Sequence, residues 1–246
     1  MRNLIVATAL LLLALPSFAA DDLVCKTDWG YEESNGPDRW GQIAPAYVDC
    51  DSGIHQSPVP LGNTGTAPNP LTAQYGSSSI TIQRTAHGMN VYTLGVLNNL
   101  RYGTVNARLQ KFHLHAPAEH PSGAAVAELH LVHVDANNNR GYVIAVLIDS
   151  DGAPNSAIQA LIDSAPEKAC TSAKLEMFPL AALLPSTTNF TTYTGSLTTP
   201  PCSPDITFFV LKTHLKISSG QFTALTSLFE GARPPQPVNS RPFLVR

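Results

Sequence analysis

The most constraining feature of this 246-residue chain is a pair of stretches, 111–115 and 126–133, in which apolar and polar residues alternate. Alternation of this kind is the period of a β-strand, whose successive side chains point to opposite faces. His113 and His115 therefore share one face of the first predicted strand. If the two strands pair with matching faces, His130 of the second strand joins them. Three imidazoles with a fourth position left open are typical of a catalytic zinc site.

Glu128 strengthens the case for a metal site, because it lies two residues before His130 and shares its strand face. Its carboxylate can accept the ring N–H of a ligand and fix the tautomer of that ligand. His120 in the intervening loop and His133 on the opposite face are predicted to have structural roles. Two histidines two residues apart recur by chance, so spacing alone leaves both a metal site and ordinary packing open.

The first segment, residues 1–20, has the composition of a targeting sequence. Arg2 precedes the apolar run 4–15, and small residues follow it. This pattern predicts a secretory signal peptide, cleaved near residue 19 or 20 and too short to span a membrane. We therefore predict one domain over residues 21–246, periplasmic or secreted, with no membrane span in the mature form.

Composition restricts the remaining possibilities. The formal net charge is −3 and no basic stripe is present, which argues against binding to nucleic acid. Twenty prolines and sixteen glycines indicate many turns. The patterns predict strands at 80–82, 89–93, 141–148 and 207–212, and short helices at 153–165 and 221–229. Because strands predominate and the helices are few and peripheral, we predict a mainly β (α+β) fold.

Four cysteines remain after the predicted cleavage. They are Cys25, Cys50, Cys170 and Cys202. An even number in an exported protein favours disulfide bonds, but four cysteines allow three different pairings. The residues alone do not choose among the three.

Several dispersed segments resemble the signature segments of the α-class carbonic anhydrases. The longest are 112–120 (FHLHAPAEH), 127–133 (AELHLVH) and 193–201 (YTGSLTTPP). Shorter matches lie at 29–31, 35–37, 56–58 and 233–237, all in the order of the family. The resemblance implies a single domain built around a large central, mostly antiparallel twisted β-sheet.

The resemblance also implies an activity. Members of this family hydrate carbon dioxide reversibly to bicarbonate and a proton, by attack of zinc-bound hydroxide. The resemblance assigns Zn²⁺ to His113, His115 and His130. The expected assembly is a monomer or a homodimer. Two alternatives are an acatalytic relative that serves as a binding module and a zinc esterase. Acatalytic relatives typically lose a zinc-binding histidine, whereas all three are present here.

Four further residues receive roles from the resemblance. Thr198 donates its hydroxyl proton to Glu119, which orients the attacking hydroxide. Tyr31 is expected to form a hydrogen bond with this threonine. His87 lies in the break between two predicted strands and is expected to shuttle protons to solvent, because a histidine titrates near neutral pH.

Carbon dioxide is small and apolar, so the resemblance also places an apolar wall beside the metal. The expected wall residues are Val132, Ile144 and Leu197. Thr199, next to the orienting threonine, is expected to contact bicarbonate.

Two positions depart from the common pattern of the family. Lys111 stands where a glutamine usually supports the first zinc ligand, and lysine has no acceptor for the N–H of that ligand. Phe208 replaces the usual tryptophan of the pocket. Neither departure removes an expected ligand.

The resemblance chooses among the disulfide pairings. It joins Cys50, which precedes the segment 56–58, to Cys202, which follows the segment 193–201. Cys25 and Cys170 then remain as the second pair.

Overall fold

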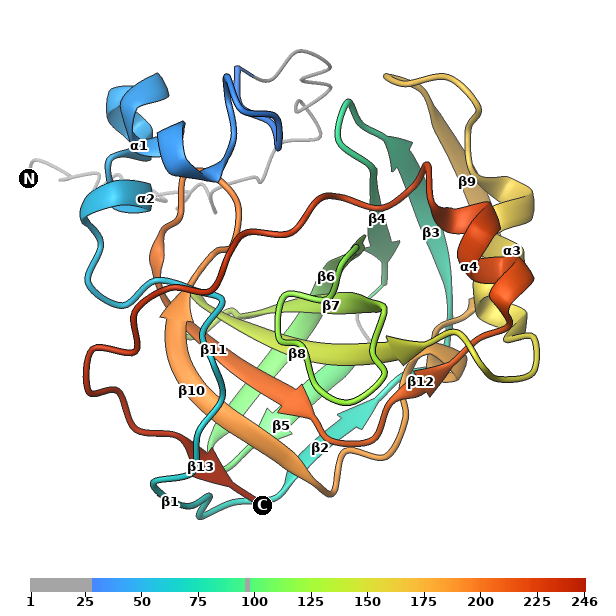
Figure 1. Ribbon diagram of the computed structural model, residues 1–246. Helices are drawn as coiled ribbons and strands as arrows, with labels where there is room; N and C mark the ends of the chain where they lie inside the picture. Colours follow the sequence, from blue (N-terminus) through green and yellow to red (C-terminus); the bar gives the residue numbers. More distant parts are fainter. Residues whose placement is uncertain (1–27, 96–97) are drawn as a thin grey trace, which may run out of the picture.

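The computed structural model describes residues 28–95 and 98–246, and a large twisted sheet forms the centre of this part (Figure 1). Its neighbouring strands follow the order β1-β13-β10-β11-β8-β7-β6-β4-β3-β9. The strands of the described chain are β1 Gly65–Thr66, β2 Leu71–Gln74, β3 Ser77–Arg84, β4 Met89–Leu94, β5 Asn99–Tyr102, β6 Val105–His115, β7 Ala127–Asp135, β8 Arg140–Asp149, β9 Ser172–Pro179, β10 Phe190–Ser196, β11 Pro204–Leu211, β12 Leu215–Lys216 and β13 Leu244–Val245.

Most neighbouring strands are antiparallel, as predicted, but the sheet is mixed. β11 and β12 run parallel to β8, and β1 runs parallel to β13. β8 lies at the middle of the strand order and is buried from Tyr142 to Asp149. This agrees with the continuous apolar run 141–148, which predicts a central strand covered on both faces.

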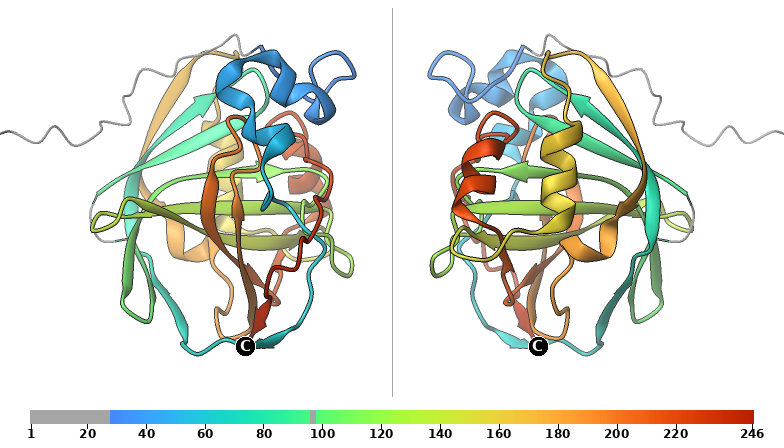
Figure 2. Two further views of the ribbon diagram at one scale, coloured as in Figure 1. Left: turned by 90° about the vertical axis from the view of Figure 1, so that its left-hand side faces the viewer. Right: turned by 90° about the vertical axis from the view of Figure 1, so that its right-hand side faces the viewer.

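Short helices lie at the edges of the sheet (Figures 1 and 2). They are η1 Pro37–Arg39, α1 Trp40–Ile43, η2 Pro45–Tyr47, α2 Asp49–Ser52, α3 Ser156–Ser164, η3 Leu180–Leu183 and α4 Ser219–Leu225. α3 and α4 confirm the two predicted helices, but each has a different start. Asn155 caps α3 by accepting two backbone N–H groups, and Ser218 caps α4 in a reciprocal pair with Gln221.

The pairing of β6 with β7 sorts their side chains into two layers. Phe112 lies opposite Leu131 and points into the large hydrophobic core. His113 lies directly opposite His130, on the other face of the sheet. A smaller apolar cluster, which includes Phe208, packs on the histidine face. The alternating pattern therefore separates the hydrophobic core from the histidines.

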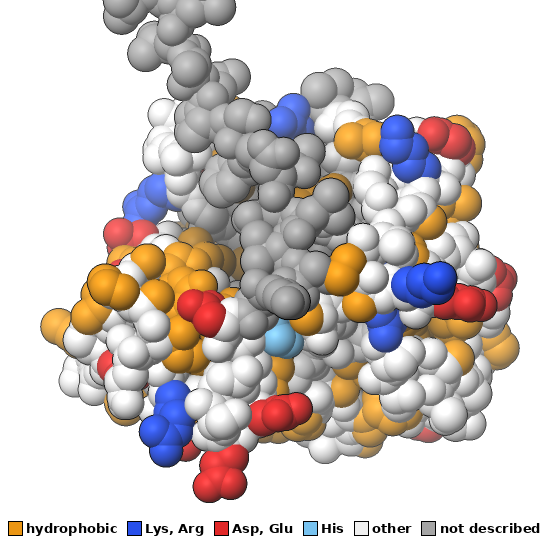
Figure 3. Space-filling view, turned by 90° about the horizontal axis from the view of Figure 1, so that it is seen from above, with side chains coloured by type: hydrophobic (Ala, Val, Ile, Leu, Met, Phe, Trp, Pro, Cys, Tyr) orange, Lys and Arg blue, Asp and Glu red, His pale blue; other side chains and the backbone are white. Residues whose placement is uncertain are grey.

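Two predictions fall on residues that the structure does not describe. The proposed signal peptide, residues 1–20, and Cys25 both lie outside the described ranges. Within residues 28–95 and 98–246, no helix is both long and apolar enough to cross a membrane. Figure 3 shows charged side chains of both signs interspersed over the coloured part of the upper face, in agreement with the absence of a basic stripe.

Candidate metal centre

Three histidine rings converge on one face of the β6–β7 pair. The ring centroids of His113 and His115 lie 4.8 Å apart, and those of His115 and His130 are also 4.8 Å apart. One nitrogen from each ring lies within 4.8 Å of the others, and all three residues are buried. Side chains two residues apart share a strand face, and the β6–β7 register sets His130 opposite His113. The spacing predicts this cluster.

Hydrogen bonds identify the ring nitrogens that remain for a metal. Nδ1 of His115 donates to the carbonyl of Gly231 at 2.7 Å, which leaves Nε2. Nε2 of His130 lies 2.8 Å from Oε1 of Glu128, which leaves Nδ1. Nε2 of His115 is buried without a hydrogen-bond partner. Because buried polar atoms are nearly always paired, this nitrogen fits a ligand to a metal ion.

Burial keeps two of the rings neutral, which is the form that binds metal. It lowers the pKa of His115 to about 4, and it lowers the pKa of His113 well below the usual value. Burial also acts against the charged form of His130. The hydrogen bond and the negative charge of Glu128 outweigh it and raise the pKa of His130. Two neutral rings and a third ring supported by a carboxylate offer three nitrogen ligands, which fits zinc.

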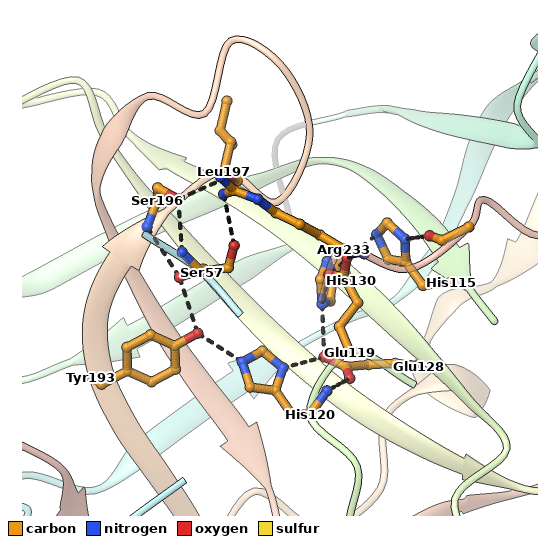
Figure 4. A network of polar contacts seen from close by, with 11 residues as sticks. Ser57, His115, Glu119, His120, Glu128, His130, Tyr193, Ser196, Leu197 and Arg233 are labelled. Carbon is orange, nitrogen blue, oxygen red and sulfur yellow. Dashed lines mark hydrogen bonds and ion pairs between the residues drawn. The ribbon is translucent and has the colours of Figure 1, made fainter. Parts of the chain in front are cut away.

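Glu128 also starts a chain of buried hydrogen bonds that leads away from the cluster (Figure 4). Its two oxygens lie 2.7 Å from the backbone nitrogen and from Nδ1 of His120. Nε2 of His120 lies 2.7 Å from the hydroxyl of Tyr193, which donates in turn to Oγ of Ser57. The ligand ring of His130 is therefore anchored to a strand and a loop distant in sequence.

The atoms of His120, Glu128 and His130 could form a second metal-binding group. They are instead bonded to one another, so this group acts as a hydrogen-bonded support. The sequence assigns His120 a structural role, which agrees with these bonds. The partners Tyr193 and Ser57 were missed, although both lie in segments that carry the resemblance.

Glu119 occupies the loop after β6 and lies beside the three rings. Its Oε2 lies 3.8 Å from Nε2 of His115, and its Oε1 accepts the backbone N–H of Arg233 at 2.9 Å. Burial raises the pKa of this carboxyl to about 7. Oε2 has no partner of ordinary hydrogen-bond geometry, although the Thr198 hydroxyl is close enough to lower this pKa.

Arg233 has a structural role that the sequence did not predict. Its guanidinium is buried and donates to Oε1 of Gln56 at 2.8 Å and to the carbonyls of Ser57 and Cys50. Gln56 in turn donates to the carbonyl of Cys202 at 3.0 Å. The N-terminal segment, the loop after β10 and the C-terminal segment are thereby held together behind Glu119.

Cys50 and Cys202 form a disulfide, as the resemblance implies, with their Cα atoms 5.0 Å apart. This bond ties the N-terminal segment to the loop that carries Thr198. The backbone N–H of Cys202 donates to the carbonyl of Thr199 at 2.9 Å, which closes a tight turn next to the site. Cys170 is also disulfide-bonded, and Cys25, its predicted partner, lies outside the described residues.

The register of β8 corrects one predicted wall residue. Ile144 lies opposite Leu131 and belongs to the large hydrophobic core, on the face away from the histidines. Val143 lies opposite Val132, and both belong to the cluster on the histidine face. Directly paired residues of antiparallel strands share a face, so Val143 takes the position expected for Ile144.

Two other positions named from the resemblance are at least half-buried. Leu197 is half-buried, and its backbone N–H donates to the carbonyl of Ser203 within the loop after β10. Phe208 is buried, stacks on Tyr193 with ring centroids 5.2 Å apart and contacts the ring of His130 edge-on. Phe208 therefore packs its apolar ring against His130.

His87 lies half-buried in the turn between β3 and β4. Its ring centroid is 4.4 Å from that of Trp29, and partial burial lowers its pKa. Gly88 allows the turn to approach closely, because a Cβ there would lie 2.8 Å from the backbone nitrogen of Glu230. Tyr31 contacts the ring of His87 edge-on, but its buried hydroxyl has no hydrogen-bond partner, so the expected bond to Thr198 is not formed.

Comparisons with known proteins agree with this geometry. A family model described as eukaryotic-type carbonic anhydrase matches residues 35–244. A carbonic anhydrase of Neisseria gonorrhoeae is 33% identical, over 98% of this chain and 96% of the relative. One from Klebsiella pneumoniae is 34% identical, over 89% of this chain and 91% of the relative.

Solved structures give the same result. The α-carbonic anhydrase of Photobacterium profundum superposes with a TM-score of 0.80 at 28% identity, over 88% of this chain and 99% of that chain. These matches define the class of protein: the chain belongs to the eukaryotic-type, or α-class, carbonic anhydrase family. Reversible hydration of carbon dioxide is the activity of this enzyme family.

Proposed function

We propose that this chain catalyses the zinc-dependent, reversible hydration of carbon dioxide to bicarbonate and a proton. The observation that carries the proposal is the convergence of His113, His115 and His130, with the buried Nε2 of His115 left without a partner. Membership of the family supports the same reaction. Zinc held by three neutral imidazoles is a Lewis acid that makes water nucleophilic near neutral pH, an effect for which carbonic anhydrases are the reference.

The protein side of the metal site is set by the hydrogen bonds to the rings. Nε2 of His115 and Nδ1 of His130 take the metal, because their other nitrogens are bound to Gly231 and Glu128. His113 supplies the third nitrogen. Holding the remote nitrogens fixes the tautomer and orientation of the rings before the metal arrives.

Thr198 orients the attacking water. When the Glu119 carboxylate accepts the hydroxyl proton of Thr198, the threonine oxygen has only lone pairs left to offer. The attacking water must then donate its hydrogen to Thr198 and turn a lone pair towards the carbon. The backbone N–H of Arg233 holds the other carboxylate oxygen, which keeps Glu119 in place.

Substrate and proton take different routes in this proposal. Val132, Val143 and Leu197 form the apolar wall that receives carbon dioxide, and Thr199 contacts the bicarbonate product. His87 accepts the proton released in each cycle and passes it to solvent, since it is half-buried rather than enclosed. Tyr31 packs beside His87 and positions the turn that carries it.

Export completes the proposal. Removal of residues 1–20 would deliver a domain of residues 21–246 to the periplasm or the medium. The Cys50–Cys202 disulfide supports this location, because disulfides persist in oxidising compartments.

The proposal is tested by measuring bound zinc and stopped-flow hydration of carbon dioxide on the same preparation. We expect one zinc per chain in the wild type. His130→Ala should lose most of the zinc and the activity. His214→Ala is the matched control, because His214 pairs with Asp149 away from the cluster. Full zinc and full activity in His130→Ala would refute the site.

The same preparation separates the alternative functions. An acatalytic binding module would not hydrate carbon dioxide, whether or not it held zinc. A dedicated esterase would turn over an activated ester faster than it hydrates carbon dioxide. Either result would replace the proposed reaction.

A further inference from the structure

The three proposed ligand rings differ in the hydrogen bonds that orient them. Nδ1 of His115 is hydrogen-bonded to the carbonyl of Gly231, and Nε2 of His130 is hydrogen-bonded to the carboxylate of Glu128. Nδ1 of His113 is buried and has no hydrogen-bond partner. Nε2 of His113 has no hydrogen bond either, but it is not enclosed by protein atoms, so it is the nitrogen that reaches the open side of the histidine cluster. The buried nitrogen, Nδ1, is therefore the one that faces away from the metal position.

The residues around His113 explain the missing acceptor. Lys111 precedes it by two positions on the same face of β6, and Asn90 of β4 lies directly opposite it. Nζ of Lys111 donates to Oδ1 of Asn90 at 3.1 Å. A lysine side chain has three donors and no acceptor. The amide oxygen of Asn90 is bound by this lysine, and Lys111 itself has nothing to offer the N–H of His113.

The positive charge of Lys111 also disfavours metal binding by His113. Lys111 lies two residues from His113 on the same face of β6, so its positive charge lies beside this ring. A positive charge beside a ligand ring disfavours a divalent cation at that ring. The buried carboxyl of Glu230 lies in the field of both Lys111 and His115 and offsets part of this charge. No described residue supplies the missing acceptor, so that effect is not offset.

We infer that Lys111, by leaving Nδ1 of His113 without a hydrogen-bond acceptor, makes His113 the weakest ligand of the proposed zinc site and lowers the affinity of the whole site for its metal. Lys111 thus acts as a positioning residue through His113. The groups that orient ligands typically change metal affinity ten- to a hundredfold when they are removed. Here the group is absent from the wild type, so supplying it should strengthen binding. The inference rests on the proposed zinc site.

The test is competition between the metal-free protein and a chelator for zinc. Lys111→Gln removes the charge and supplies an amide oxygen for Nδ1 of His113. We expect it to bind zinc about tenfold more tightly and to release it correspondingly more slowly. Lys111→Met removes the charge without supplying an acceptor and should stay within about threefold of the wild type. Lys212→Gln, an exposed lysine, is the control for loss of one positive charge.

A second measurement reports on the hydrogen bond itself. In the zinc-loaded Lys111→Gln protein, the Nδ1 proton of His113 should exchange with solvent more slowly than in the wild type, as followed by NMR. Unfolding temperatures of the metal-free variants should match that of the wild type, which excludes a general change in stability as the cause.

Two results would overturn the inference. One is unchanged zinc affinity in Lys111→Gln, and the other is an equal gain in Lys111→Met. Both leave the proposed function intact, because the wild type still binds zinc. If the wild type bound zinc no better than His130→Ala, the metal site and this inference would fail together.

Discussion

Oε1 of Glu128 lies 2.8 Å from Nε2 of His130, so a buried carboxylate fixes one nitrogen of a ring whose other nitrogen faces the histidine cluster. The two oxygens of this carboxylate also meet two donors of His120. These bonds hold the pKa of Glu128 well below its usual range, although burial alone would raise it. The carboxylate is therefore ionised and complements the N–H groups around it.

Replacing this carboxylate by an amide tests its role. In Glu128→Gln, one of the two acceptor oxygens becomes an NH₂ group that faces other donors. We expect zinc affinity to fall ten- to a hundredfold, measured by chelator competition. Glu167→Gln, an exposed carboxylate, is the control and should not change it. Wild-type affinity in Glu128→Gln would mean that the orientation of His130 does not depend on this bond.

His133 gives the fold a defined sensitivity to acid. It is fully buried, with Nε2 2.6 Å from the hydroxyl of Tyr75, and burial lowers its pKa to about 4. An unfolded histidine titrates near 6.5, so protons bind the unfolded chain more readily. The stability that this residue contributes is complete above pH ~6.5 and is lost as pH falls towards 4. By linkage the loss at pH 5 is about 2 kcal/mol.

Urea unfolding at pH 7 and pH 5 measures this contribution. Both wild type and His133→Gln are kept in the same chelator, so that the metal site contributes equally. The drop in stability between the two pH values should be about 2 kcal/mol smaller in His133→Gln. If the free energy of unfolding fell equally in both proteins, protonation of His133 would not be the cause of the loss at pH 5.

The Cys50–Cys202 disulfide should contribute to stability through the length of chain it encloses. Its two cysteines are 152 positions apart. In the loop-entropy account, a closure of this size stabilises the fold on the order of 3–5 kcal/mol. We expect the double replacement by serine to lose this amount in urea unfolding. Peptide mapping without reductant checks the pairing, and a different partner for Cys202 would contradict it.

His87 should limit turnover without limiting the attack on carbon dioxide. Its ring contacts that of Trp29, and His87 is neither a proposed ligand nor part of the apolar wall. We expect His87→Ala to lower kcat in weak buffer, to leave kcat/KM nearly unchanged, and to recover turnover with added imidazole. Thr198→Ala should instead lower kcat/KM, because it disturbs the orientation of the attacking water. A His87→Ala defect in kcat/KM that imidazole did not relieve would remove the shuttle role.

The sequence predicts the ligand cluster because alternation fixes the face of each residue. His113 and His115 lie in a strictly alternating stretch and His130 lies in a largely alternating one, so the three share a face once the two strands pair. The continuous apolar run of β8 has no such alternation. Ile144 and Val143 are equally apolar, and only the register with β7 decides which one faces the histidines.

Hydrogen bonds between residues far apart in the chain could not be predicted from the sequence either. Arg233 bonds to Gln56 across 177 positions, and Tyr193 bonds to Ser57 across 136. No local period connects residues so far apart. The boundaries of α3 and α4 differ from the predictions for a different reason: the capping side chains of Asn155 and Ser218 choose the first turn.

The pairing of β6 with β7 has a consequence for what the metal can do for the fold. His113 and His130 are 17 positions apart, whereas the disulfide closes a span of 152. Closing the longer span costs the free chain about 2 kcal/mol more entropy. The disulfide and the buried Arg233 therefore restrain distant parts of the chain. The metal would link two strands that are already paired. We expect the protein without metal to keep its overall frame and to loosen first between β6 and β7.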